Sequence, residues 1–144
     1  TITGWFASET QFEFDVRSFE FHKDARRFEL GTTANAAVYA ASAGLDLVHE
    51  IGVDSLRART TELVSDLVDR AVDAGFEVKT PSRSEDRAGI VMVRTDRPAK
   101  AVKALGAEGI IADYRHDRVR ASPYFYNSPE DNAHFIESLQ KSLR

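Results

Sequence analysis

Two arginines separated by one residue are the strongest candidates for chemistry in this sequence of 144 residues. Arg118 and Arg120 flank Val119 in a run that predicts a strand, so both side chains should point to the same face. A guanidinium is a rigid fork that binds a carboxylate through parallel hydrogen bonds, each contributing on the order of 1.5–3 kcal/mol. The simpler alternative is a surface ion pair with Asp113 or Asp117, and the residues alone favour it.

A glycine followed by two threonines, Gly31-Thr32-Thr33, forms a second candidate site. These residues lie between extended chain and a predicted helix. Hydroxyl groups and free backbone N–H groups at the start of a helix bind anions such as phosphate. The alternative is that Thr32 or Thr33 only caps the helix, and the residues alone favour this simpler role.

The other ionisable residues form no comparable pattern. None of the four histidines has the HxxxH or HExxH spacing of a metal site, so no metal site is predicted at His22, His49, His116 or His134. Glu130 and Asp131 fall in the first turn of a predicted helix, where negative charge is favourable by roughly 0.3–1 kcal/mol without any catalytic role. Cysteine is absent, which excludes disulfides, thiol nucleophiles and zinc–thiolate sites from this chain. We therefore predict no catalytic residue here.

Composition narrows the class of protein. Apolar residues make up 42% and charged residues 29%, which is typical of a globular domain. The net charge of −4 argues against nucleic-acid binding, which needs a basic surface. The sequence has no apolar run long enough to span a membrane and no signal-peptide pattern, so a cytoplasmic location is expected. The chain opens at Thr1, which suggests a processed, truncated or partly sequenced polypeptide.

The elements that must position these residues begin with an arm. Phe12, Phe14 and Val16 alternate with polar residues, and Phe19 and Phe21 follow in the same way. This alternation predicts extended, half-buried chain. The arm either folds onto its own domain or crosses a larger neighbour.

The rest of the chain predicts an α+β domain. Apolar residues at helical spacing predict helices over 34–51 and 54–74, with Gly52 ending the first and Asp54 capping the second. Shorter patterns predict strands at 76–79, 88–95, 109–113 and 118–122, and a helix at 98–106. The sequence "SPED" at 128–131 has the Ser, Pro and acid of a helix start.

Taken in order, these pieces resemble the C-terminal part of a class V aminotransferase-type pyridoxal-phosphate enzyme, the superfamily of kynureninases and cysteine desulfurases. The sequence "RFELGTTAN" (Arg27–Asn35) resembles the family motif RFExGTPxx. "GWF" (Gly4–Phe6) resembles the Gly-Trp segment of kynureninases. "RAGIVMVRT" and then "GIIADYRHDRVRASPYFYNSPED" resemble the family's end region. The match covers nearly the whole chain.

The resemblance implies a fold and a place within a larger enzyme. The fold would be α+β, as in the small C-terminal domain of a fold type I pyridoxal-phosphate-dependent transferase. A small, antiparallel-rich sheet would pack with helices after an extended arm and a long helix. Residues 1–32 would end the large cofactor domain, and residues 33–144 would form the small domain. The chain would be a C-terminal fragment.

The resemblance also implies a function for the parent enzyme. It would use pyridoxal 5'-phosphate to act on a small amino acid, by transamination or lyase chemistry, and would form a homodimer. This chain would lack the cofactor lysine, would need the missing N-terminal large domain, and would be inactive alone. We do not expect it to bind the cofactor by itself.

Three residues take roles from the resemblance. Arg120 matches the family arginine that binds the α-carboxylate of the substrate. Thr32 matches the threonine that reaches the cofactor phosphate, usually across a dimer interface. Trp5 matches the kynureninase tryptophan near the same phosphate and the substrate mouth. Tyr126 and Asn127 match a "YN" pair before the last helix, for which a structural role is expected.

The His22-Lys23 pair is not expected to be the cofactor-binding site. The family lysine sits in a turn with a Gly-Pro-rich stretch soon after it, whereas Lys23 precedes "DARRFELGT", which resembles a later segment. Lys23 is therefore predicted to be a surface lysine. The sequence departs from the family in two further places. Thr33 replaces a frequent Pro, and Ser8 replaces the His of kynureninases; the second departure argues against kynurenine as substrate.

A second hypothesis comes from a different class. The chain could be a free-standing, non-catalytic α+β module that binds a ligand or regulates a partner, since a fold does not by itself grant a function. Surface hydrophobicity discriminates the two ideas. A piece of a larger enzyme should expose an apolar face around residues 12–21, whereas a complete module should not.

Overall fold

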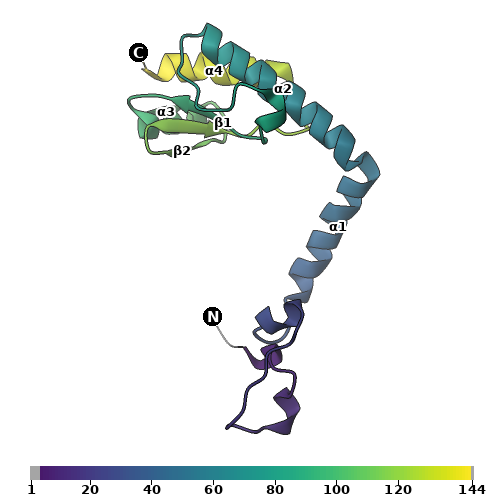
Figure 1. The fold of residues 1–144 in the computed structure, drawn as a ribbon. Coiled ribbons are helices and arrows are strands. Elements are labelled where there is room, and N and C mark those ends of the chain that lie inside the picture. Colours follow the sequence, from purple (N-terminus) through teal and green to yellow (C-terminus); the bar gives the residue numbers. More distant parts are fainter. Residues whose placement is uncertain (1–3, 144) are drawn as a thin grey trace. The chain divides into compact units, whose positions relative to one another are not determined.

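The structure is a computed structural model that describes residues 4–143. The chain divides into two compact units, Thr1–Leu47 and Val48–Arg144. Figure 1 shows their helices and the small sheet. No helix among residues 4–143 is long and apolar enough to cross a membrane. The boundary expected between residues 32 and 33 separates domains of a whole enzyme, and it stays a prediction.

Short turns build the start of the first unit, in place of the regular extended chain that the sequence predicts. The first long helix follows three 3-10 helices, η1 (Trp5–Ala7), η2 (Gln11–Glu13) and η3 (Ala25–Phe28). One isolated antiparallel bridge joins Ser8 to Phe21. Ala7 and Ser8 are the only buried residues between positions 4 and 47.

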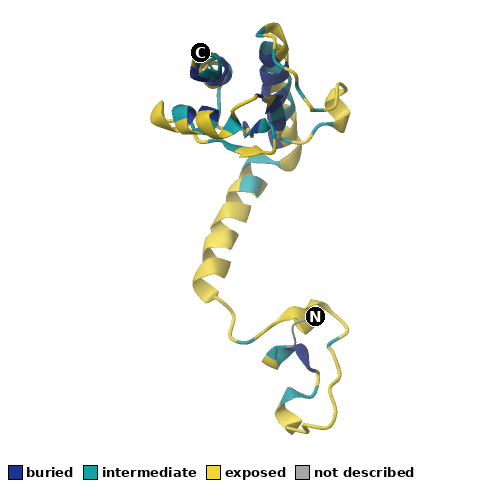
Figure 2. Cartoon of the chain, turned by 90° about the vertical axis from the view of Figure 1, so that its left-hand side faces the viewer, coloured by how far each residue is buried: buried dark blue, intermediate teal, exposed yellow. Residues whose placement is uncertain are grey.

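The apolar side chains of this arm stay open to solvent. Phe12 and Phe14 are each 69% exposed, and Val16 is 97% exposed. Figure 2 shows the exposed colour along most of this segment. The arm therefore does not bury these apolar side chains within its own unit.

A glycine separates the two long helices, α1 (Asn35–Ile51) and α2 (Val53–Asp73). Gly52 has a φ of +86°, a backbone conformation that residues with a Cβ rarely adopt. Gly52 is also the residue before α2, and no side chain caps that helix. The prediction that Asp54 is the cap is therefore wrong: Asp54 lies inside the first turn, where its charge favours the helix end.

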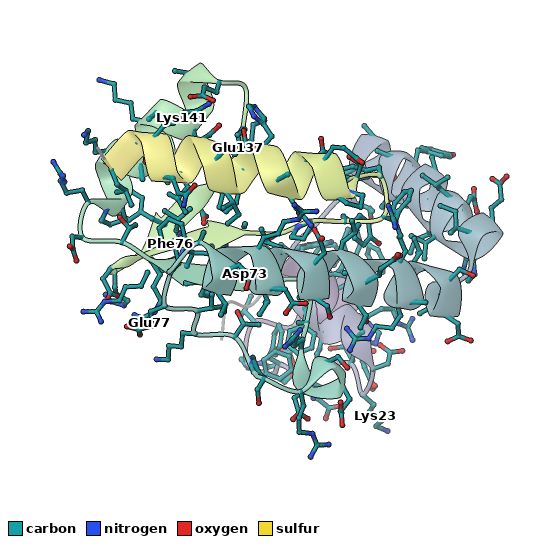
Figure 3. All side chains as sticks on the ribbon, turned by 90° about the horizontal axis from the view of Figure 1, so that it is seen from above. Lys23, Asp73, Phe76, Glu77, Glu137 and Lys141 are labelled. Atoms are coloured by element: carbon teal, nitrogen blue, oxygen red, sulfur yellow. The ribbon has the colours of Figure 1, made fainter. Side chains whose placement is uncertain are left out.

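The second unit combines a three-stranded antiparallel sheet with helices on one face. The strand order is β1–β3–β2, with the bounds Val91–Arg94 (β1), Asp113–Arg115 (β2) and Arg118–Ala121 (β3). The helices are α2, α3 (Pro98–Ala107) and α4 (Pro129–Leu143), and a 3-10 turn, η4, spans Ser84–Asp86. Helices α2 and α4 run side by side (Figures 1 and 3). The predicted α+β class is confirmed.

Alternation along the strands decides which residues face the core. Val91 and Val93 of β1 and Val119 of β3 are fully buried, and they meet side chains from all three helices, including Leu67, Leu105 and Leu139. The intervening residues of β3, Arg118 and Arg120, lie on the opposite face, as the strand period requires. The sheet thus turns both arginines away from the core.

The last helix starts as the sequence predicts. The Ser128 hydroxyl accepts from the Asp131 N–H at 3.3 Å, and the Asp131 carboxylate accepts from the Ser128 N–H at 2.9 Å. This reciprocal pair satisfies donors that a helix start leaves free. Asn127 supports the same turn, because its amide donates to Asp131 and accepts from the Tyr124 N–H.

One buried polar contact joins α2 to α4. The Asn132 side chain is 4% exposed and donates to the Leu63 carbonyl at 2.9 Å and to Asp66 at 2.8 Å. Asp66 also pairs with Arg70 at 2.8 Å. Partial burial acts to raise the pKa of Asp66, but the hydrogen bonds from Arg70 and Asn132 outweigh it and lower that pKa. The carboxylate therefore stays charged and fixes the register of the two helices.

Two predicted strands differ from the structure. Residues 76–79 form a single bridge, Val78 to Val93, although backbone hydrogen bonds flank it on both sides. The strand expected at 109–113 begins only at Asp113, because Gly109 has a φ of +79° and ends α3 in a tight turn. Short strands are extended by pairing with distant residues, which local patterns do not report.

Candidate functional site

Arg120 sits on the central strand, directly opposite Asp113 of the edge strand β2. Its Nε donates to Asp113 Oδ1 at 2.7 Å, and its Nη2 donates to Asp113 Oδ2 at 2.6 Å. These bonds lower the pKa of the Asp113 carboxyl below its usual value. The ion pair that the residues alone favoured is therefore present, and it holds the guanidinium in one orientation.

This ion pair occupies only one edge of the guanidinium. Arg120 Nη1 makes no hydrogen bond with residues 4–143. The end formed by Nη1 and Nη2 can donate two parallel hydrogen bonds to a second carboxylate, in the geometry that arginine favours. A depression of ≈ 220 Å³ opens beside it, lined by Ile111, Ala112, Asp113, Arg120 and Ser122. The ion pair and a ligand contact are thus compatible.

Arg118 shares the face of Arg120, as predicted, but its environment differs. It pairs with Asp117 and, at 3.2 Å, with Glu77. Arg94 also pairs with Glu77 at 2.7 Å and with Asp117 at 3.2 Å, so the two arginines and the two acids form one ion-pair network. Figure 3 shows Glu77 just beyond the end of α2. Only 19% of the Arg118 side chain is exposed, which makes Arg118 a structural residue and leaves Arg120 as the ligand-binding candidate.

The threonines at the start of α1 do not cap it. Neither the Thr32 nor the Thr33 hydroxyl makes a hydrogen bond with the part of the chain that the structure describes, and both residues are exposed. The backbone closes the turn instead, because the Asn35 N–H donates to the Thr33 carbonyl at 2.8 Å. The capping alternative for these hydroxyls therefore has no support, and both remain available to a ligand.

Trp5 lies in η1 of the same unit and is half exposed. Its ring meets Phe14 at a centroid distance of 5.7 Å, and both rings line a depression of ≈ 460 Å³. Its backbone N–H donates to the Leu30 carbonyl at 2.9 Å. This bond ties Trp5 to the chain that leads to Thr32.

Gly4 makes that approach possible, and replacing it by alanine should displace Trp5. A Cβ on Gly4 would lie 2.1 Å from the Leu30 Cα, far inside van der Waals contact. Overpacking of this kind typically costs about 1–3 kcal/mol, and here the backbone must move. Trp5 is the only tryptophan, so its fluorescence maximum and its quenching by acrylamide report the change directly. Gly31→Ala is the matched control, because a Cβ there meets nothing within 4 Å. Equal spectra for both variants would contradict the close packing of Gly4 against Leu30.

Lys23 is an exposed residue in the bend that follows the Ser8–Phe21 bridge. The next residue, Asp24, accepts from the Arg26 N–H at 3.0 Å and starts η3. Lys23 is thus a surface lysine, as predicted, and Asp24 beside it caps a short helix.

Sequence reasoning missed one feature of the second unit. Arg57 is exposed on α2 and borders a depression of ≈ 620 Å³. The walls come from the start of α2, from residues 88–89 and from the chain after β3. Spacing along one helix gave no signal of this, because the other walls are distant in sequence.

Acidic and histidine side chains give no metal site. No group of three or more such residues within positions 4–143 is placed to hold an ion. Two candidates for anion binding remain, the Arg120 guanidinium for a carboxylate and the exposed Thr32 hydroxyl for a phosphate.

Comparisons with known proteins agree on one family. A sequence model described as "Kynureninase C-terminal domain" matches residues 55–139. An aminotransferase of Bacillus subtilis (strain 168), YcbU, is 31% identical over 137 residues, which is 95% of this chain and 35% of that protein. A kynureninase of Bacillus mycoides (strain KBAB4) is 28% identical, over 99% of this chain and 35% of its own length. The chain thus spans about a third of these relatives.

Solved structures show the same fold. The chain matches a cysteine desulfurase from Thermococcus onnurineus NA1 with a TM-score of 0.80 and 19% identity, over 99% of this chain and 38% of that one. A cystine C-S lyase bound to its product cysteine persulfide matches with a TM-score of 0.79 and 18% identity, over 96% and 37%. At such identities the likeness establishes the fold alone.

Proposed function

The chain belongs to the kynureninase C-terminal domain family, and we propose that it forms the C-terminal part of a longer pyridoxal-phosphate-dependent enzyme of the class V aminotransferase type. The enzyme acts on an amino acid by transamination or lyase chemistry. Relatives about three times as long, named aminotransferase and kynureninase, support this proposal. The remaining length would carry the large cofactor domain.

The observation that carries the proposal is the free end of the Arg120 guanidinium. Asp113 holds its other edge, so the group is already oriented before a ligand arrives. Preorganised donors bind a carboxylate without the entropy loss of being ordered first. We assign to Arg120 the α-carboxylate of the substrate.

The residues of the first unit fit one part of the cofactor, its phosphate. The Thr32 hydroxyl is exposed and has no hydrogen-bond partner among residues 4–143, and it stands at the start of α1, where backbone donors favour an anion. Trp5 offers its indole N–H, which is a donor only, to the same group. When bound, the cofactor would supply an electron sink for bonds at the substrate α-carbon. A second copy of the chain would bring Thr32 to it across a homodimer interface.

The alternative is a free-standing module without catalysis. The exposed aromatic arm weighs against it, because large exposed apolar patches on a complete domain mark surfaces that bind something else. Phe12 and Val16 have no cover within their own unit. We propose that the missing large domain covers them in the complete enzyme.

Lysine labelling tests the proposal directly. The chain is incubated with pyridoxal phosphate and reduced with borohydride, and the labelled lysines are identified by mass spectrometry. We expect Lys23 to react no faster than exposed lysines such as Lys100 and Lys103. In the protein encoded by the complete reading frame, one lysine outside residues 1–144 should be labelled selectively. Selective, saturable labelling of Lys23 in this chain would overturn the assignment.

A further inference from the structure

A second depression in the second unit adjoins the one at Arg120. It measures ≈ 620 Å³, and its walls include the apolar side chains of Val53, Leu56 and Pro123. Ser122 lines this depression and also the one beside Arg120. Since Ser122 comes two residues after Arg120, a ligand held by the guanidinium can extend over Ser122 into the apolar groove.

A cation borders this groove without a carboxylate partner. The exposed side chain of Arg57 makes no ion pair with residues 4–143, and its one hydrogen bond, to the Ser84 carbonyl, is long at 3.4 Å. Arg59, Arg70, Arg118 and Arg120 of the same unit pair with acids, whereas Arg87 and Arg97 donate to uncharged oxygen atoms at 2.5–3.2 Å. The Thr60 hydroxyl, in a residue that is 7% exposed, also lacks a partner in the described chain. Buried polar groups rarely lack a hydrogen-bond partner. The Thr60 hydroxyl and the Arg57 guanidinium can therefore both hydrogen-bond to a polar group placed in the groove.

We propose that this groove receives the side chain of the amino-acid substrate, and that Arg57 binds an anionic group at the end of that side chain. The substrate class is an amino acid with an apolar chain of several carbons that ends in a carboxylate or a similar anion. The proposal rests on the proposed function, because it takes the α-carboxylate to be at Arg120. Arg57 is then a specificity-determining residue.

Two acids of equal chain length separate the roles of the two arginines. Heptanoate carries one carboxylate and pimelate carries two, and neither needs the cofactor to bind. Each is titrated into the 144-residue chain while NMR follows the Nε–H groups of Arg57 and Arg120 and the amides of Gly89 and Ser122. We expect pimelate to bind roughly tenfold more tightly than heptanoate and to shift all four signals.

Three variants complete the experiment. Arg57→Gln should abolish the preference for pimelate and leave heptanoate binding at Arg120 unchanged, and Arg57→Lys should restore part of the preference. Arg83→Gln removes the same charge from an exposed loop residue and should change nothing. Dispersed amide spectra confirm that each variant is folded.

The outcomes distinguish the two proposals. If both acids bound with equal affinity and the Arg57 and Gly89 resonances did not shift, the proposal that the groove binds the substrate side chain would be overturned. The role of Arg120 would stay intact. No response of Arg120 to either acid would overturn the carboxylate role itself. A fourth variant, Arg120→Gln, separates a subsite from an independent site: unchanged binding of pimelate to it would show that the groove is a separate anion site and not a substrate subsite.

Discussion

Replacing Arg120 by glutamine should weaken binding of the amino-acid substrate to the complete enzyme by about a hundredfold or more, and leave its cofactor content unchanged. Hydrogen bonds to charged groups contribute on the order of 1.5–3 kcal/mol each, and a carboxylate on the free end of the guanidinium makes two. Substrate dissociation constants and bound pyridoxal phosphate are measured on the same preparations. Glutamine retains hydrogen-bonding groups but loses both the charge and the fork.

Arg118→Gln is the matched control for this experiment. It removes the same group two residues away on the same face, where the partners are Asp117 and Glu77 rather than a ligand. We expect lower stability for this variant and nearly unchanged substrate affinity. If Arg120→Gln lost substrate affinity and bound cofactor equally, or lost neither, the proposed carboxylate-binding role of Arg120 would be wrong.

Leu139→Ala should strongly destabilise the second unit, at a cost of about 2–5 kcal/mol. Leu139 is fully buried in α4 and belongs to the core formed by the sheet and the helices. The loss combines the removed apolar surface with the cavity left behind, and domains of this size are typically stable by only about 5–15 kcal/mol. Urea unfolding followed by circular dichroism measures the change in the free energy of unfolding.

Leu45→Ala provides the comparison, because Leu45 in α1 is 59% exposed in this chain. The same truncation at an exposed site usually changes stability by less than about 0.5 kcal/mol. If the two leucine variants lost equal stability, the core would not be where the structure places it.

Features set by neighbouring residues were predictable from the sequence. The reciprocal contacts of Ser128 and Asp131 depend on a spacing of three residues, and the shared face of Arg118 and Arg120 depends on the period of a strand. The ends of α1 and α2 were predicted to within about two residues. The predicted cap of α2 was wrong, because Gly52 is the residue before the helix and Asp54 lies inside its first turn.

Features that depend on distant residues were not predictable. The sequence predicted Asp113 or Asp117 as ion-pair partners, but Arg118 and Arg120 have the same local pattern. Only the fold reveals which acid each arginine meets, that Arg118 also meets Glu77, and that Arg120 keeps a free edge. The groove beside Arg57 likewise needs residues near positions 89 and 123. Spacing reports which residues share a face, but tertiary pairing decides which partner each of them meets.

The hairpin of β2 and β3 has a consequence for how such a site can evolve. Asp113 and Arg120 are cross-strand neighbours within it, so the piece that presents the guanidinium also contains the residue that aims it. Mutations that repack the helices alter the opposite face of the sheet, and they can accumulate without redirecting this arginine. A lineage could therefore change the surrounding walls while it inherits the oriented Arg120 guanidinium and its Asp113 partner as a single short segment.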